Sequence, residues 1–358
     1  MGNSITFFLD GKEVSASEND SIWQVAKKQG NTLPHLCYSD KTGYRADGNC
    51  RACMVSIEGE RVLAASCIRK PTQGMKVSTV DERSKKSREM VLELLVTDQP
   101  KKDDSHDPNS HFWSMANKVN VEDSRFDKKS KSQVPVADIS NKAMSVNLDS
   151  CIHCNLCVRA CREVQVNDVI GMGMRGHSSK VIFDFDDPMG ESTCVSCGEC
   201  VQACPTGALM ESSLLDEYGK HKGEPDREVD SLCPYCGVGC QLTFKIKDEK
   251  IVSAIGRDGP ANNNRLCVKG RFGFDYIHNP ERITKPLIRK NGIKKDPTER
   301  VNPLDPSSHF REASWEEALD LVAERLIKIR DNIPGKSLAG FGCAKGSNEE
   351  AYLFQKLV

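Results

Sequence analysis

The sequence has 358 residues, and its 50 Lys and Arg residues balance 51 Asp and Glu residues. This length suits two to four domains, and the balanced charge gives no field that would indicate nucleic acid or an anionic membrane as a partner. The 17 cysteines are the exceptional feature. No export signal or bilayer-spanning run is visible, so we expect a cytoplasmic protein whose thiolates bind metal rather than form disulfides.

Residues 1–80 are expected to form a small β-grasp domain. Asp10-Gly11 predicts a hairpin turn between residues 4–9 and 12–16. Residues 19–30 predict a helix with polar capping residues at its start and a glycine at its end. A second hairpin is indicated by residues 54–57, Glu58-Gly59 and residues 61–66.

A first group of four cysteines lies within this domain. They follow the pattern C-x12-C-x2-C-x13-C, at Cys37, Cys50, Cys53 and Cys67. Four thiols on a long loop suit a 2Fe-2S cluster, and Gly43 and Gly48 would let the backbone turn tightly around it. A zinc knuckle is the alternative, although zinc sites usually join two C-x2-C pairs.

Residues 81–143 read as one helix followed by a polar connector. The helix is expected over residues 81–96, with an apolar face formed by Met90, Val91, Leu94 and Leu95. The rest is polar and charged, and only Phe112, Trp113 and Met115 offer an anchoring patch. We expect this connector to have little core of its own.

Residues 144–212 contain two runs with the spacing C-x2-C-x2-C-x3-C, separated by a short strand at residues 181–185. In this pattern three thiolates bind one 4Fe-4S cluster and the fourth binds the cluster of the other run. The expected groups are Cys151, Cys154, Cys157 and Cys204, and Cys194, Cys197, Cys200 and Cys161. Zinc is again the alternative. His153 is expected to be a solvent-facing spacer.

A polar linker is expected over residues 213–229, followed by a further cluster-binding domain over residues 230–285. Its pattern, C-x2-C-x3-C-x26-C, suits another 4Fe-4S cluster. The cysteines are Cys233, Cys236, Cys240 and Cys267. From the residues alone, nearby Lys269 is an ordinary surface lysine.

Residues 286–358 are expected to begin an α/β domain. Ser314 with Glu317 and Ser347 with Glu350 predict two capped helices, and residues 337–342 read as a buried strand between them. One strand and two helices cannot complete a core, so we expect the N-terminal part of a longer protein. The remaining cysteine, Cys343, is expected to be buried and free.

These modules, together with "CPYCGVGC", "LCVKGRFGFDYIHNPERITKPLIR" and "GCAKGSNEEAYLFQKL", closely resemble the N-terminal part of the α subunit of NAD-dependent molybdenum or tungsten formate dehydrogenases. The resemblance implies an α+β multi-domain fold and a whole protein that oxidises formate to carbon dioxide. The implied cofactor is a molybdenum or tungsten bis-molybdopterin guanine dinucleotide, to which Lys269 relays electrons. The implied catalytic residues lie beyond Val358. The implied partners are a flavin subunit with FMN and NAD and a small iron-sulfur subunit.

One departure from this family concerns a cluster bound by one histidine and three cysteines. Relatives introduce it with a His-Pro pair, where this sequence has Gln99-Pro100, and no cysteine occurs between Cys67 and Cys151. That cluster cannot form here in its usual way, which makes the step from the paired clusters to the 2Fe-2S domain the weak link of the expected electron route.

Three other classes share parts of this pattern. The large iron-sulfur subunit of NADH:quinone oxidoreductase fills one cluster of the pair, whereas all eight cysteines are present here. An iron-only hydrogenase shares the first modules but lacks the pattern from Cys233 to Cys267. A non-catalytic electron carrier also fits. The sequence therefore predicts one 2Fe-2S and three 4Fe-4S clusters, with about 14 iron atoms per chain.

Overall fold

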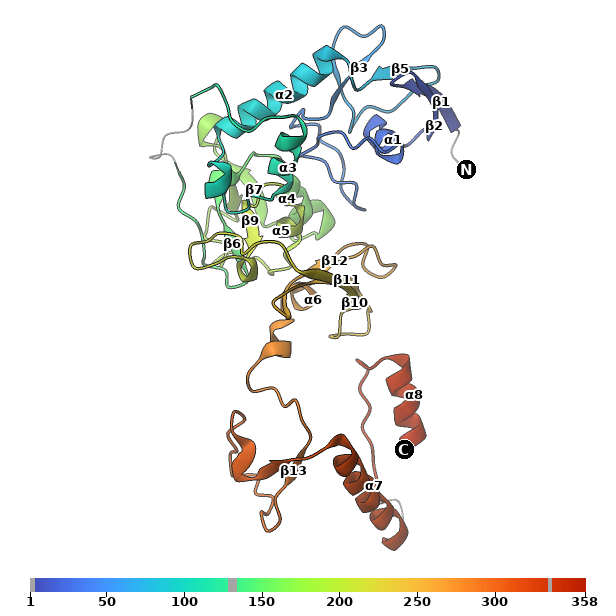
Figure 1. Cartoon of the computed structure of the whole chain (residues 1–358), viewed down its shortest axis with the longest axis vertical. Coiled ribbons are helices and arrows are strands. Elements are labelled where there is room, and N and C mark those ends of the chain that lie inside the picture. The colour runs from blue at the N-terminus through green and yellow to red at the C-terminus, as the bar shows by residue number, and fades with distance from the viewer. Residues whose placement is uncertain (1–3, 128–133, 334–336) are drawn as a thin grey trace. The chain divides into compact units, whose positions relative to one another are not determined.

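The computed structural model describes residues 4–127, 134–333 and 337–358 (Figure 1). The chain forms two compact units, Met1–Ser231 with Cys240–Phe272 and Leu232–Gly239 with Gly273–Val358. Part of the connector predicted over 81–143, residues 128–133, lies outside the described residues. Within the described part, no helix combines the length and the apolar character needed to cross a bilayer.

The N-terminal part of the first unit is a five-stranded sheet crossed by one helix. Its strand order is β2-β1-β5-β3-β4. The bounds are Ser4–Leu9 for β1, Lys12–Ser17 for β2, Met54–Ile57 for β3, Ala64–Ala65 for β4 and Lys76–Ser78 for β5. Asp10 and Gly11 have φ of 50° and 80°. Two successive positive φ angles are typical of a type I′ turn, so the predicted first hairpin is confirmed.

Helix α1 (Ile22–Lys28) packs on this sheet and supplies much of its core. Ser21 and Gln24 form a reciprocal capping box. Ile22, Trp23 and Val25 are buried in one cluster with apolar side chains of β1, β2, β3 and β5. The second hairpin is shorter than predicted, because β4 contains two residues and Ile57 pairs with Val77 of β5 instead.

Helix α2 (Glu82–Thr97) begins where predicted, but only Val91 and Leu95 of its predicted apolar face pack, partly buried, against the core. The side chains it buries are Ser84, Arg88, Leu92 and Val96. Leu94, which the spacing placed inside, is 49% exposed. The difference follows from Arg88, whose guanidinium donates to the carbonyls of Met54 (2.7 Å) and Thr79 (2.6 Å) and so turns this face inward.

Helix α3 (His111–Lys118) confirms the anchoring patch of the connector. Phe112, Trp113 and Met115 are buried with Leu92 and Val96 of α2. The expectation of little core was therefore wrong, since this region shares a substantial apolar cluster with the β-grasp domain.

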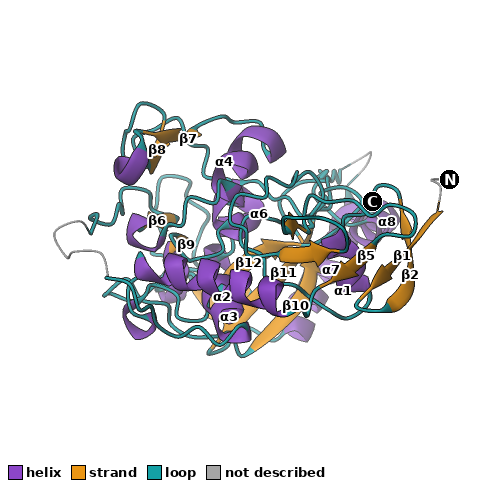
Figure 2. Cartoon of the chain, turned by 90° about the horizontal axis from the view of Figure 1, so that it is seen from above, coloured by secondary structure: helices purple, strands orange, loops and turns teal. Residues whose placement is uncertain are grey.

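The next region is built around two small antiparallel pairs, β6 (Met144–Val146) with β9 (Leu209–Glu211) and β7 (Ile170–Gly173) with β8 (Lys180–Phe183). The strand predicted between the cysteine runs is thus confirmed as β8. Each cysteine run leads into a short helix, α4 (Leu156–Arg159) and α5 (Glu199–Ala203). Helix α4 continues as a π-helical turn over Ala160–Val164, and β7 lies beside it (Figure 2).

A three-stranded sheet follows, in the order β10-β11-β12. Its strands are β10 (Arg227–Leu232), β11 (Gln241–Lys247) and β12 (Lys250–Gly256), and α6 (Val268–Phe272) packs against β12. Strand β10 begins inside the range predicted as a linker.

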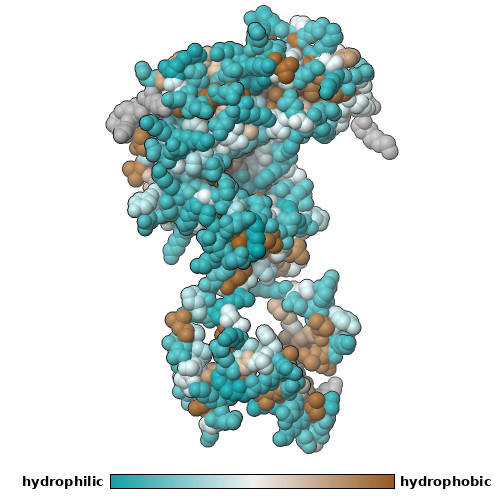
Figure 3. Space-filling model, in the orientation of Figure 1, coloured by the Kyte–Doolittle hydropathy of each residue, from teal (hydrophilic) through white to brown (hydrophobic). Residues whose placement is uncertain are grey.

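The second unit contains the strand pair β13 (Leu287–Arg289) and β14 (Phe310–Glu312), and the helices α7 (Trp315–Asn332) and α8 (Asn348–Leu357). Ser314 and Ser347 cap these helices, as predicted. Neither helix buries a side chain. Figure 3 shows hydrophobic atoms at the surface over α8, where Tyr352 is 61% and Leu353 60% exposed.

The strand predicted at residues 337–342 is wrong. No described residue of this segment is in a strand, and Phe341 is 96% exposed. No described strand pairs with the segment, and an isolated strand would leave its peptide groups without ladder partners. Cys343 is exposed rather than buried for the same reason.

Candidate iron-sulfur centres

The fold brings the first four predicted cysteine ligands together. Cys37 lies in the loop after α1, Cys50 and Cys53 precede β3, and Cys67 follows β4. The Cys37 thiol makes hydrogen bonds with Cys50 and Cys67, and Cys67 also makes one with Cys53. The amide of Cys50 donates to Sγ of Cys37 over 3.4 Å.

The acidity of these thiols reflects that contact. Hydrogen bonds from Cys50 and then from Cys67 lower the pKa of Cys37 far below its ordinary value. A hydrogen bond with Cys67 lowers the pKa of Cys53 to about 7, whereas that of Cys67 is raised, first by Cys37. Buried thiols that share protons in this way would exchange those protons for metal, which requires the thiolate form.

Gly48 lets the loop between Cys37 and Cys50 follow its path. Its φ is +64°, and a Cβ built on it would lie 2.3 Å from Cδ1 of Ile68. Gly43 also has a left-handed backbone, with a φ of +95°. The two glycines therefore act as the sequence predicted.

The two later cysteine runs repeat one backbone conformation. In the first run, His153 and Asn155 have φ of 53° and 61°; at the equivalent places of the second run, Ser196 and Gly198 have 52° and 71°. Amides of the turns donate to sulfur, from His153 to Cys151 (3.5 Å) and from Ser196 to Cys194 (3.4 Å). Amide donors directed at sulfur are one of the means by which proteins set cluster potentials. His153 is exposed, as expected of a spacer.

The eight thiols of these runs fall into two electrostatic groups. Cys154 and Cys157 both interact with Cys151 and Cys204, and Cys157 also interacts with Cys200 of the other run. Cys194, Cys197 and Cys200 each interact with Cys161. This is the membership that a crossed arrangement requires.

Burial disfavours the thiolate form of three of these cysteines. Burial raises the pKa of Cys154, Cys157 and Cys200 above the ordinary thiol value. Cys157 and Cys200 lie in one apolar cluster with Val146 and Leu209, so neither has water to solvate a charge. Coordination to a cation would remove this penalty, because a metal-bound thiol is deprotonated.

The last four predicted ligands are divided between the two units. Cys233 and Cys236 belong to Leu232–Gly239, whereas Cys240 and Cys267 belong to Cys240–Phe272. The structure therefore does not describe them as one site. Lys269 is an exposed residue of α6, two positions after Cys267. Among the described residues, no three His, Cys, Asp or Glu side chains converge on a point where one metal ion would sit.

Three buried charged residues near the cysteines were missed by the sequence reasoning: Arg159, Glu199 and Arg271. The Arg271 side chain is 0% exposed and pairs with Glu199 at 3.2 Å. Its Nε donates to the carbonyl of Cys197 over 2.8 Å. The available signal for a buried ion pair was the acidic residue Glu199 within the second cysteine run.

Tyr44 extends this buried pair to the loop of the first cysteine group. Its hydroxyl donates to Oε1 of Glu199 over 2.8 Å. Burial first, and then the Glu199 charge, raise the pKa of Tyr44, which keeps its proton available for that bond. Tyr44, Glu199 and Arg271 thereby join three cysteine-bearing segments of the first unit.

Gln99 precedes Pro100 at the position where the family resemblance implied a histidine. Its side chain is buried, and Nε2 donates to the carbonyl of Ser150 over 3.1 Å. Ser150 immediately precedes Cys151. Gln99 thus ties the end of α2 to the first cysteine run by a hydrogen bond.

Family models match four segments of the chain. Residues 2–82 match a 2Fe-2S iron-sulfur cluster binding domain, and residues 150–208 match a 4Fe-4S dicluster domain. Residues 226–279 match the molybdopterin oxidoreductase Fe4S4 domain, and residues 282–358 match molybdopterin oxidoreductase.

Relatives with the same organisation cover the whole chain. The chain is 30% identical to a candidate oxidoreductase, YjgC, of Bacillus subtilis and 29% identical to a candidate formate dehydrogenase of Staphylococcus haemolyticus. Both alignments cover 100% of this chain and 38% of the relative, so the chain spans well under half of their length.

A solved structure is similar in fold over part of the chain. A chain in the crystal structure of an NAD+-reducing [NiFe]-hydrogenase in the H2-reduced state matches with a TM-score of 0.52 and 24% identity, over 59% of this chain and 88% of that chain. Together with the family models, this confirms the predicted succession of 2Fe-2S, 4Fe-4S and molybdopterin oxidoreductase domains. The chain therefore contains a 2Fe-2S domain and 4Fe-4S domains, followed by the start of a molybdopterin oxidoreductase domain, as its cysteine patterns indicated.

Proposed function

We propose that this chain is the electron-transfer part of a formate dehydrogenase α subunit. In the whole protein, formate would lose two electrons and a proton to give carbon dioxide, and NAD+ would take up two electrons and a proton on a flavin-bearing partner subunit. When bound, the clusters would supply one-electron carriers between these two-electron reactions, and a molybdenum or tungsten bis-pterin cofactor would supply the site of formate oxidation.

The observation that carries this proposal is the grouping of the thiols. Three sets of four cysteines would each hold one cluster: Cys37, Cys50, Cys53 and Cys67; Cys151, Cys154, Cys157 and Cys204; Cys194, Cys197, Cys200 and Cys161. The first set would hold 2Fe-2S and the others 4Fe-4S. The burial of seven of these twelve thiols supports this, because apolar surroundings keep water away from the sulfur atoms.

A fourth cluster would be held by Cys233, Cys236, Cys240 and Cys267, as the match to the Fe4S4 domain supports. Lys269 would then lie beside it as the electron relay toward the pterin. The expected route runs from there through the paired clusters to the 2Fe-2S centre. A flavin and NAD-binding subunit, a small iron-sulfur subunit and a cytoplasmic location complete the proposal.

Metal analysis tests the ligand assignment. We expect the full-length protein, purified without oxygen, to contain about 14 iron atoms per chain and no zinc. Cys157→Ser should remove about four irons and Cys53→Ser about two, because each loses one ligand of one cluster. The matched control is Cys343→Ser, which removes an exposed thiol outside every group and should leave the iron content unchanged.

The crossed pattern has its own readout. Cys204→Ser should abolish the same electron paramagnetic resonance signal as Cys154→Ser, and Cys161→Ser the same signal as Cys197→Ser. If Cys204→Ser and Cys197→Ser instead remove the same signal, each run binds its own cluster and the assignment is wrong. Zinc in place of iron would overturn the proposal altogether. Formate-dependent reduction of these signals in the complete enzyme tests the substrate.

A further inference from the structure

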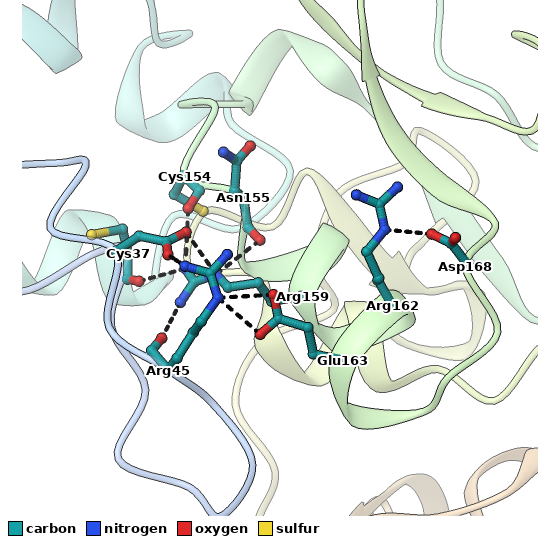
Figure 4. Close-up of polar contacts among 9 residues, drawn as sticks. Cys37, Arg45, Cys154, Asn155, Arg159, Arg162, Glu163 and Asp168 are labelled. Atoms are coloured by element: carbon teal, nitrogen blue, oxygen red, sulfur yellow. Dashed lines mark hydrogen bonds and ion pairs between the residues drawn. The ribbon is translucent and has the colours of Figure 1, made fainter.

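One buried arginine contacts two cysteine loops that lie far apart in the sequence. Arg159 is the last residue of α4, and its side chain is 2% exposed. Figure 4 shows its guanidinium between the loop that carries Cys37 and the turn that carries Cys154. Its Nη2 donates to the carbonyl of Cys37 over 2.7 Å and to the carbonyl of Cys154 over 3.3 Å.

The other nitrogens of Arg159 make contacts in the same two loops. Nη1 donates to the carbonyl of Arg45, and Nε donates to the carbonyl of Asn155 over 3.3 Å (Figure 4). Nε also lies 3.1 Å from Oδ2 of Asp47, which is itself 10% exposed. A buried guanidinium is stable only when a counter-charge neutralises it and acceptors bind its N–H groups. Here both loops supply these partners.

The thiols of the two loops also pack together. Cys37, Cys154 and Leu156 form one buried apolar cluster, bordered by partly buried Cys50 and Ile152. The charge of Cys37 acts on the thiol of Cys154. Under the proposed function, these thiols are ligands of different clusters, so the 2Fe-2S centre and the first 4Fe-4S centre adjoin across this contact.

We propose that Arg159 is a positioning residue that holds these two centres at the separation needed for direct electron transfer. This inference rests on the proposed function. In one step the 4Fe-4S centre is oxidised by one electron and the 2Fe-2S centre is reduced by one electron. Arg159 takes no part in the electron count. The contact gives the electron a route that does not need the histidine-bound cluster, whose place Gln99 occupies.

The planar fork of arginine matters as much as its charge. Its two bonds from Nη2, and the bonds from Nη1 and Nε, point in fixed directions, whereas a lysine ammonium is a single compact donor on a flexible stem. Arg159→Lys therefore keeps the positive charge but loses the hydrogen bonds that join the carbonyls of Cys37 and Cys154. Arg159→Met loses both.

The test uses the full-length holoprotein with its iron content measured first. For Arg159→Lys we expect full iron, nearly unchanged reduction potentials, and an electron-transfer rate between the two centres, after flash reduction, that falls by about tenfold or more. The magnetic interaction between the two reduced centres in the resonance spectrum should weaken. Arg159→Met should in addition lower both potentials, because a cation near a cluster favours its reduced state.

Arg162→Gln is the matched control. It removes an arginine charge three residues away, but Arg162 is 55% exposed and pairs with Asp168 at the surface. The electron-transfer rate between the 2Fe-2S centre and the first 4Fe-4S centre, the reduction potentials of these two centres and their magnetic interaction should stay as in the unmodified protein. Loss of the magnetic interaction in this variant to the same extent as in Arg159→Lys would overturn the proposal.

Asp47→Asn covers the case in which Arg159→Lys loses iron. It removes the counter-charge and leaves the carbonyl bridges, so we expect full iron, higher potentials and an unchanged rate.

If Arg159→Lys retains iron and transfers electrons at the original rate, the inference fails while the proposed function stands. If the unmodified protein lacks the 2Fe-2S signal, the proposed function fails. Loss of the 2Fe-2S centre alone in both Arg159→Lys and Asp47→Asn would make Arg159 a folding residue and also overturn the inference.

Discussion

Single residues show which parts of the site can be read from a sequence. The cysteines were predictable because each cluster type requires its ligands at set intervals. The buried charges were not, because their partners are distant in the chain. Arg159 meets Cys37 across 122 positions, and Arg271 meets Glu199 across 72. Only the fold makes such a charge tolerable.

Glu211 is a buried carboxyl whose protonation should make stability depend on pH. It lies on β9, is 3% exposed, and its Oε2 has no hydrogen-bond partner among the described residues. Desolvation raises its pKa to about 7, although Arg271 and Lys245 act in the opposite direction. The folded protein thus holds a proton that the unfolded chain releases at lower pH.

The sign of the effect follows from linkage. The stabilising contribution is complete below the unfolded pKa, declines as pH rises, and is lost above about pH 7. Between pH 5 and pH 8 it should amount to at most about 3 kcal/mol. We expect Glu211→Gln to remove this dependence of the unfolding free energy, measured by urea titration without oxygen. Glu249→Gln, at an exposed carboxylate, should retain it; equal slopes in both variants would contradict the assignment.

At the scale of elements, helix caps and turns were predictable from the sequence. The side of a helix that becomes buried was less predictable. Ser21, Ser314 and Ser347 begin helices as predicted, since a side-chain oxygen that meets the first amides is a local property. The face that α2 buries depends on what it packs against. The sheet offers two carbonyls there, and Arg88 meets them while Leu94 stays outside.

Arg88→Met should therefore destabilise the β-grasp domain although it adds an apolar residue. It would leave the carbonyls of Met54 and Thr79 without their donor, at a cost of about 2–4 kcal/mol. Urea unfolding followed by the 2Fe-2S absorbance measures it. Lys85→Met, at an exposed position of the same helix, should cost under about 0.5 kcal/mol. A similar loss in both variants would show that helix propensity, not the carbonyl bonds, is responsible.

Gly198 is the tightest point in the turns of the paired cluster domain. Its φ is +71°, and a Cβ on it would lie 2.1 Å from Cδ of Arg271. Gly198→Ala should displace Arg271 from Cys197 and lower the unfolding temperature, with loss of about four irons. Gly59→Ala has a similar φ of +84° but nothing within 4 Å, so it isolates backbone strain of about 1 kcal/mol. Equal effects on the unfolding temperature would mean that the clash is absent.

At the scale of the whole molecule, the order of the domains was predictable, and the burial of the last two helices was not. Each domain carries its own cysteine spacing, which the family models match in the predicted order. The helices of the second unit have amphipathic sequences, but burial needs a partner surface that a helix cannot specify. α7 and α8 accordingly bury no side chain, and the strand predicted between them has no neighbour.

The pairing of β6 with β9 has a consequence for biosynthesis. Residues 144–146 and 209–211 bracket both cysteine runs. During translation β6 cannot pair with β9 until all eight thiols of these runs have emerged, because β9 is made after them. If iron and sulfide are delivered before this pairing, the thiols are exposed and reactive. If they are delivered after it, the folded domain already encloses the thiols. The cell's iron-sulfur insertion machinery therefore has to act while β6 pairs with β9.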